Sequence, residues 1–472
     1  MRINQKLCYV VKNHTETKMN SSNRLYQYLS TATALLSMVT AGMHYAWPSP
    51  SLPQLTSNSS SFQITSDEGS WIVVMELIAP IPACFFGAAI VDTIGRKKAT
   101  ATAIPYFVSW LMIAFASSAL TLGAARVIAG LADGVIFTVV PVYIGEIADP
   151  QIRGFLGSSI SAVWILGMLL INVMGSYLSI TATAVTSSIV PLLFLVTFVW
   201  MPESPYFLIM KDDAEGALSA LKKFKGRSDV EGELSRLQQA VKIQRETRRN
   251  FFDLFRKRSN LKGLGVIVVL RNAQQMSGLA ATIFYTISIF QEAGDFMSPL
   301  TSTTVYVSIQ CVMAVTCSIA IDRTGRRPLL IASLVGSAIA LSLEGTYFYI
   351  KDFTSVDTSS FNFVPVVALL GYVIVFNVGA QPIPLLMLGE LFPTSVKALA
   401  SCLCEVYCCV VAAIVSKFFQ VVRDSFGMYL PFYAFSLCCV VNLVFVVLFV
   451  PETKGKTLEE IQNCHRKKEQ TN

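Results

Sequence analysis

Two short charged segments with the same pattern stand out in this sequence. Asp92 lies three residues before a Gly-Arg pair that ends at Arg96, and Asp322 lies three residues before a second such pair that ends at Arg326. Each segment separates two apolar runs, and an acidic residue before a glycine is ordinary turn chemistry. One copy would therefore mean little, but two copies indicate a duplicated unit.

Two further features repeat in the same order and strengthen this interpretation. Glu146 lies seven residues before Arg153, and Glu390 lies seven before Lys397. A Pro-Glu-Ser segment ends an apolar run in the first half, and a Pro-Glu-Thr segment ends the last run of the second. Three acidic and basic markers in the same order predict a membrane protein with two related halves.

Opposite charges at the ends of membrane helices can act as a gate, because they are solvated in one state and neutralise each other in another. The simpler alternative is that they only cap helices and fix topology, since isolated surface ion pairs contribute little. The candidate gating residues are Asp92, Arg96, Glu146, Arg153, Glu203, Asp322, Arg323, Arg326, Glu390, Lys397 and Glu452.

The composition requires that these charges be positioned by membrane helices. The chain has 472 residues, of which 53% are hydrophobic and only 14% charged. A soluble protein would have roughly a quarter charged residues. About twelve apolar runs reach the ~20 residues that cross a bilayer. The first 25 residues are polar, so we expect no cleavable signal peptide. The predicted spans are 26–47, 71–91, 99–119, 122–145, 155–178, 181–201, 263–291, 300–321, 328–350, 361–390, 396–420 and 430–450.

The predicted fold is therefore all-α, with twelve transmembrane helices in two pseudo-symmetric bundles of six. Loops rich in Lys and Arg alternate with loops that have almost none, and this asymmetry places both termini and the long central loop in the cytoplasm. The predicted organisation is an N-terminal tail (1–25), a first bundle (26–201), a linker with short amphipathic helices (202–262), a second bundle (263–450) and a C-terminal tail (451–472).

Most of the excess positive charge lies in that linker. The chain has a net charge of +7, and residues 211–262 contain 14 Lys or Arg against 8 Asp or Glu. A basic cytoplasmic loop obeys the positive-inside rule, so nucleic acid is not an expected partner. Val230, Leu234, Leu237 and Val241 recur at helical spacing, which predicts an amphipathic helix. That helix could latch the inner mouth or simply connect the two halves.

Residues 48–70 are rich in Ser, Thr and Pro, and the topology places them outside. Asn58 lies in a glycosylation sequon there. The 11 cysteines fall mostly within apolar runs, where cysteine is usually a small packing residue. Their spacing matches no common zinc pattern, so we expect no metal site and no cofactor.

Several of these motifs together resemble the sugar porter family of the major facilitator superfamily, over about residues 30–460. Ala46-Trp47-Pro48-Ser49-Pro50 is similar to the trehalose-transporter-like branch known from insects. The resemblance implies a monomeric plasma-membrane carrier that moves a sugar or polyol down its gradient. The motifs are Asp92-x-x-Gly95-Arg96, Pro141-Val-Tyr143, Glu146, Arg153-Gly154, Pro202-Glu203-Ser204-Pro205, Gln274-Gln275-Met-Ser277-Gly278, Pro382-Ile-Pro384, Glu390-Leu-Phe392 and Pro451-Glu452-Thr453.

The resemblance also implies where the solute binds. Family members hold the sugar with amides on the seventh span, where this chain has Gln274 and Gln275, and Phe284 and Tyr285 take the place of an outer aromatic gate. An amide suits a sugar because it offers donors and an acceptor without a charge to desolvate. The two glutamines could instead hold helices together. The other candidate positions are Ser161, Gln310, Asn377 and Leu385.

Several of these positions depart from the family pattern. Ser161 stands where a Gln is common, Asn377 where a Glu is common and Leu385 where a Trp is common; Ala280 replaces an Asn. The fold and topology survive these changes. Because these positions differ, the resemblance does not identify the solute.

Three further residues carry unusual chemistry for a membrane interior. Arg271 lies one turn before Gln274, so it could pair with Glu405, bind an anionic solute or lie at the membrane interface. His44 occupies about the position of the aspartate that proton-coupled relatives carry on the first span, and histidine can titrate near neutral pH.

The leading functional hypothesis is facilitated diffusion of a sugar or polyol through the bilayer by alternating access. The alternatives are a proton symporter that uses His44, a nutrient sensor that does not transport, and a carrier of an organic anion. We do not expect an enzyme, because no nucleophile–base set or phosphate-binding loop is evident.

Overall fold

The computed structural model describes residues 24–57, 62–99, 103–149, 151–226, 229–246, 253–256, 258–294, 296–392 and 394–452. These residues are almost entirely helical, and they contain no strand. Asn58, the predicted glycosylation site, lies outside the described residues.

The first half forms one bundle, whose helices cover the first six predicted spans. Two of those spans, the second and the sixth, are each built from two consecutive helices. The helices are α2 (Leu25–Ala46), α3 (Pro48–Thr56), α4 (Ser66–Ile78), α5 (Pro80–Ile94), α6 (Arg96–Ala99), α7 (Ala103–Ala114), α8 (Ala119–Ile147), α9 (Arg153–Tyr177), α10 (Ile180–Ser187) and α11 (Ile189–Phe198).

The second half repeats this organisation after a linker of four short helices, α12 (Pro205–Met210), α13 (Ala214–Lys225), α14 (Glu231–Glu246) and α15 (Asp253–Arg256). Its helices cover the remaining predicted spans. They are α16 (Arg258–Gln275), α17 (Leu279–Phe284), α18 (Thr286–Ala293), α19 (Pro299–Thr324), α20 (Arg326–Phe353), η2 (Ser359–Phe361), α21 (Val364–Val378), α22 (Ile383–Leu391), α23 (Thr394–Phe426) and α24 (Tyr429–Phe449).

Length and hydropathy support the membrane prediction. Within the described residues, eight helical segments are individually long and apolar enough to cross a bilayer. The chain is therefore a multi-pass membrane protein.

One predicted loop is helical in the structure. Residues 48–56 were expected to lie in an outer segment, but they form α3, and Pro48, Pro50 and Leu52 are all buried. A proline at the first position of a helix costs no hydrogen bond, so Pro48 starts a new helix directly after α2. The first span is thereby extended, and α3 packs against α9 and α18.

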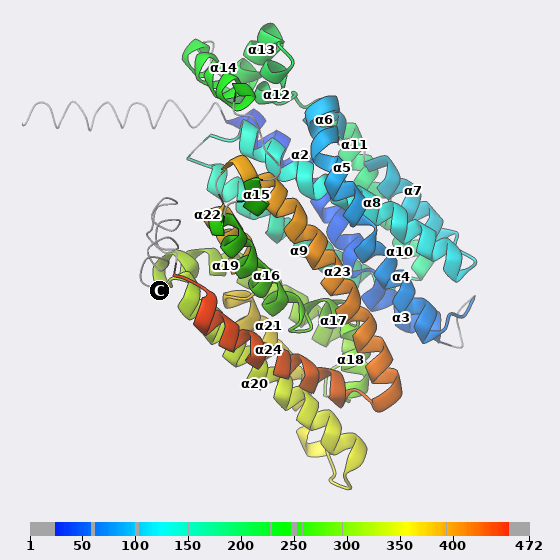
Figure 1. Ribbon diagram of the computed structural model, residues 1–472. Coiled ribbons are helices and arrows are strands. Elements are labelled where there is room, and N and C mark those ends of the chain that lie inside the picture. The colour runs from blue at the N-terminus through cyan, green and yellow to red at the C-terminus, as the bar shows by residue number, and fades with distance from the viewer. Residues whose placement is uncertain are drawn as a thin grey trace, which may run out of the picture.

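Figure 1 shows the two bundles side by side, with α12–α14 beyond one end of the molecule. We call this the linker end and the opposite end the far end. The bundles meet where α9 contacts α19 and where α23 contacts α4 and α5.

The buried apolar residues show at which end the bundles are joined. The far half of the molecule has one core cluster that contains residues of both bundles, among them Trp47 and Ile165 from the first and Phe284 and Phe419 from the second. The linker half has two separate clusters, one for each bundle. Among the described side chains, the bundles therefore share a buried core at the far end, while at the linker end each bundle has a core of its own.

Helices α12–α14 of the linker pack on one another and on the first bundle, whereas α15 packs on α16 and α23 of the second bundle. Val241 of α14 packs with Ile209 of α12 and Ala217 of α13, and Leu234 and Leu237 lie against the same cluster. The apolar face of α14 is thus covered within the linker itself, which fits a connector better than a latch.

An ion pair attaches this group of helices to the first bundle. Lys225 pairs with Asp149, which also accepts a hydrogen bond from Arg24 at 3.2 Å. Burial disfavours the ionised carboxylate, but Lys225, Gln27 and Arg24 outweigh it, so the pKa of Asp149 lies below its usual value. The contact therefore persists until acid protonates Asp149.

Helices α2 and α9 cross so closely that only glycine fits at the crossing. A Cβ on Gly42 would lie 2.0 Å from the carbonyl oxygen of Trp164, and a Cβ on Gly167 would lie 2.2 Å from that of Val39. Both obstacles are backbone atoms, so the helices would have to separate.

We expect Gly42→Ala and Gly167→Ala each to destabilise the protein by about 1–3 kcal/mol or more, as overpacking does. The matched control is Gly157→Ala on the same helix α9, where nothing lies within 4 Å of the new Cβ. Thermal unfolding of the detergent-solubilised protein would measure the effect. Equal melting temperatures for Gly167→Ala and Gly157→Ala would contradict this packing.

Candidate functional site

The charged motif of the first half forms a compact set of contacts at the linker end. Arg96 makes two hydrogen bonds to Glu146, Nη2 to Oε1 at 2.8 Å and Nε to Oε2 at 3.0 Å. Glu203 accepts from the backbone N–H of Lys97 at 3.0 Å. Gly95 has a φ of +104°, and a Cβ there would lie 2.6 Å from Glu203, so the turn requires glycine.

The second half repeats this arrangement. Arg326 donates from Nη2 to Glu390 at 2.8 Å, and Glu452 accepts from the backbone N–H groups of Arg326 and Arg327 at 3.1 and 3.0 Å. Gly325 has a φ of +106° and lies against Glu452. The repeated sequence pattern therefore builds the same structure twice: an arginine–glutamate pair, with a second glutamate that caps the next helix.

These pairs join helices within one bundle and do not bridge the two. Glu146 pairs with Arg96, while Arg153 donates to the carbonyl oxygen of Ala148 at 3.2 Å. A cross-bundle role for the charges in the opposite state stays a prediction. Four members of the set have side chains outside the described residues: Asp92, Asp322, Arg323 and Lys397.

The seventh predicted span is broken where the binding residues were expected. Helix α16 ends at Gln275, and α17 begins at Leu279 after a turn. Gly278 in that turn has a φ of +85°, and a Cβ there would lie 2.4 Å from the ring of Phe435. The interruption places two adjacent amides, Gln274 and Gln275, at a helix end inside the protein.

The two glutamines differ in their hydrogen bonding. Gln274 accepts from Arg271 at 2.8 Å and donates to the carbonyl oxygen of Gln381 at 2.9 Å, so both ends of its amide are engaged. The Oε1 atoms of Gln275 and Gln310 are buried and have no hydrogen-bond partner among the described residues. Since a buried unpaired acceptor is costly, these two amides are ready to bind a hydroxyl donor.

Arg271, which is buried, pairs with the carboxylate of Glu405, whose side chain is 45% exposed. Its Nη2 lies 3.4 Å from Oε2 of Glu405, and its Nε lies 3.1 Å from the sulfur of Cys404. Arg271 is only 5% exposed, so its guanidinium lies inside the protein. Its charge is matched by Glu405 and partly used to hold Gln274.

The predicted outer aromatic residues lie in the tightly packed far half. Phe284 contacts Tyr45 of the first bundle, with 4.8 Å between ring centroids. Tyr285 stacks on Phe419 of α23 at 5.0 Å, and the guanidinium of Arg423 lies over its ring. Of these contacts, the one between Phe284 and Tyr45 joins the two bundles, whereas Tyr285, Phe419 and Arg423 all belong to the second bundle.

The remaining predicted binding residues differ in their exposure. Asn377 is buried and donates to the carbonyl oxygen of Val373 in its own helix at 2.8 Å. Ser161 is exposed, and Leu385 is 56% exposed. Gln275 and Gln310 therefore have unpaired buried acceptors, and the roles of Ser161, Asn377 and Leu385 stay predictions.

His44 is enclosed by aromatic rings. It is fully buried, and its ring stacks on Trp110 at 3.9 Å between centroids and on Tyr106 at 5.4 Å. Its carbonyl oxygen accepts from Arg126 at 2.6 Å. The imidazole does not face water, which does not favour a role in proton coupling.

Sequence reasoning did not identify two features of the first bundle. Glu76 and Arg126 form an ion pair that is almost completely buried, although each was visible as a charge in an apolar run. The ring centroids of Trp164 and Tyr45 lie 5.1 Å apart. The indole N–H of Trp164 has no hydrogen-bond partner among the described residues. A single tryptophan in a membrane span does not indicate from sequence alone that its N–H is unpaired.

Two related helical bundles, joined at one end and separated at the other around buried unpaired amides, are the architecture of a membrane carrier that works by alternating access. Comparison with known proteins supports the assignment to this class of membrane carrier. The sequence matches the family described as sugar (and other) transporter over residues 12–464.

Among curated proteins, the facilitated trehalose transporter Tret1 of Polypedilum vanderplanki is 34% identical over 450 residues, which cover 94% of this chain and 89% of that protein. Tret1 of Drosophila mojavensis is also 34% identical over 94% of this chain, which spans about half (52%) of that longer protein.

Solved structures agree on the fold. The inward open form of the xylose transporter XylE from E. coli superimposes with a TM-score of 0.77 at 21% identity, over 93% of this chain and 99% of that one. XylE bound to 6-bromo-6-deoxy-D-glucose gives 0.72 at 23% identity, over 94% and 99%. The chain belongs to the family of sugar (and other) transporters; it is a membrane transporter and not an enzyme.

Proposed function

We propose that this protein carries a small neutral sugar or polyol, such as trehalose or a hexose, across the plasma membrane down its gradient. One observation carries the choice of a hydroxyl-rich solute. Gln275 and Gln310 present buried amide oxygens without a partner among the described residues, and Arg271, four residues before Gln275, is paired with Glu405. Hydroxyl groups of a neutral solute would satisfy these acceptors without bringing a charge that must be desolvated.

We also propose an orientation and an assembly state. The basic linker obeys the positive-inside rule if the linker end is cytoplasmic, and both termini then lie in the cytoplasm. The far end is then extracellular, so the structure represents an inward-facing state, closed outside. One chain supplies both bundles, and a monomer in the lipid bilayer is therefore sufficient for transport.

In this proposal the transport cycle is a rocking of one bundle against the other. Solute leaves through the separated linker end, and the bundles then close there and part at the far end. Trp164 would supply an N–H donor and a ring face to the solute from the first bundle. The relatives named as trehalose transporters support a disaccharide as the first solute to test.

The competing functions have weaker support. Proton symport through His44 would need an imidazole that water can reach, and this one is fully buried. Transport of an organic anion would need an unmatched cation, and Arg271 has Glu405. A sensor that does not transport would bind the solute with the same amides, and the absence of uptake would distinguish it.

Uptake of radiolabelled solutes into cells that express the protein would test the proposal. The panel should contain trehalose, glucose, fructose, a polyol and an organic anion. We expect saturable uptake of at least one neutral sugar, unchanged when the external pH is varied. Uptake of the anion alone would contradict the proposed solute class.

A further inference from the structure

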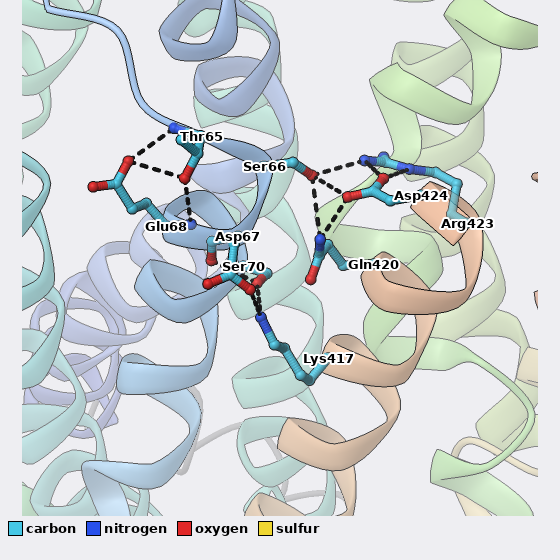
Figure 2. A network of polar contacts seen from close by, with 9 residues as sticks. All are labelled: Thr65, Ser66, Asp67, Glu68, Ser70, Lys417, Gln420, Arg423 and Asp424. Carbon is cyan, nitrogen blue, oxygen red and sulfur yellow. Dashed lines mark hydrogen bonds and ion pairs between the residues drawn. The ribbon is translucent and has the colours of Figure 1, made fainter. Parts of the chain in front are cut away.

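A polar network joins the two bundles at the far end, on the side of α4 that faces α23 (Figure 2). Lys417 of α23 forms an ion pair with Asp67 of α4 and donates to the Oγ of Ser70 at 2.7 Å. Its ammonium group also lies 4.9 Å from the ring centroid of Trp71, so three side chains of α4 hold one lysine.

A second group of contacts lies further along α23 (Figure 2). Ser66, the first residue of α4, donates to Asp424 at 2.6 Å and accepts from Arg423 at 3.3 Å. Gln420 donates to the same Asp424 at 2.5 Å. Lys417, Gln420 and Asp424 are spaced three and four residues apart and therefore share one face of α23.

The start of α4 is well suited to hold this network in place. Thr65 and Glu68 form a capping box, in which Thr65 accepts from the Glu68 N–H at 3.1 Å and Glu68 accepts from the Thr65 N–H at 2.8 Å. The box fixes the first turn that carries Ser66 and Asp67.

We propose that these residues form an outer latch, which exists only while the outer mouth is closed and which biases the carrier toward its inward-facing state. Helix α4 belongs to the first bundle and α23 to the second, so these contacts must break when the bundles part at the far end. The inference rests on the alternating access and orientation proposed above.

The latch biases the equilibrium but does not lock it. The side chain of Asp67 is 65% exposed and that of Lys417 is 24% exposed, so water and salt weaken the pair. Contacts of this strength can be broken in every transport cycle. They should also respond to extracellular ionic strength.

The test is labelling of one introduced cysteine from outside, because this reports opening of the outer mouth and does not depend on the solute. Thr286 of α18 is 1% exposed in the closed far half, so Thr286→Cys should react with a membrane-impermeant thiol reagent only when that mouth opens. Surface expression of each variant and labelling of the protein without the new cysteine provide the baseline.

We expect Lys417→Met and Asp67→Asn, each combined with Thr286→Cys, to raise the rate of labelling at the introduced thiol about two- to fivefold, the range for loss of one partly exposed ion pair. Lys417→Arg should restore the original rate. The matched control is Lys351→Met, which removes another far-end cation, one that donates to the carbonyl oxygen of Glu292 within its own bundle. Raising the external salt concentration should speed labelling in the parent protein and have less effect on Lys417→Met.

Equal labelling rates in the parent, Lys417→Met and Asp67→Asn would overturn the latch. An equal increase in Lys351→Met would do so as well, because it would show a general charge effect. The outcome is separable from the proposed solute, since labelling can change as expected even if none of the sugars tested is taken up.

Discussion

Replacing Arg126 by methionine should prevent most of the protein from folding. The ion pair between Arg126 and Glu76 is almost completely buried, with side-chain exposures of 0% and 3%. Removing one partner leaves a buried charge without compensation, which costs about 3–5 kcal/mol. That loss is a large part of the stability of an ordinary domain.

The double variant Arg126→Met/Glu76→Met separates this cause from a general intolerance of substitution. We expect it to recover much of the folded protein, measured as the monodisperse fraction after solubilisation, because neither charge remains. Arg153→Met is the control, since Arg153 is exposed and should be tolerated. A double variant as unstable as Arg126→Met would show that the guanidinium is needed for its bond to His44 and not for charge balance.

The two adjacent glutamines should separate binding from structure. Gln275→Ala should weaken the apparent affinity for the sugar by about 1–3 kcal/mol, roughly 5- to 160-fold, because the solute loses the hydrogen bond to this amide oxygen. It should leave thermal stability nearly unchanged.

Gln274→Ala is the matched neighbour. Its amide bonds both Arg271 and Gln381, so its loss should lower the melting temperature as well. Binding curves and melting temperatures of both purified variants would measure the two effects. If Gln275→Ala bound sugar as well as the parent while Gln274→Ala lost binding without loss of stability, our assignment of the two amides would be reversed.

The helices and the symmetry could be predicted from the sequence because their signals are local. Long apolar runs identify the spans, and the spacing around Arg96 and Arg326 identifies the duplication; both are confirmed in the fold. Helical spacing also places Arg271 beside Gln274. The pairing of Arg271 with Glu405 is one of the three alternatives that the sequence allows.

What could not be predicted depends on contacts between distant parts of the chain. Nothing local marks Gln381, more than 100 residues away, as the acceptor for the Gln274 amide N–H; the amide oxygen of Gln274 accepts from Arg271, only three residues earlier. Lys417 was assigned to a membrane span, and its partner Asp67 lies 350 residues away on α4. The buried helix α3 was missed because its prolines and serines are typical of a loop.

The most direct test of the account is counterflow in vesicles reconstituted with the purified protein. Vesicles preloaded with unlabelled trehalose or hexose and diluted into tracer should accumulate the label transiently, with no ion gradient and in the presence of a proton uncoupler. Alternating access without coupling predicts this result, because one binding site exchanges solute between the two sides. Accumulation that occurs only with an imposed proton gradient, or none for any neutral sugar by a folded protein, would contradict facilitated sugar transport.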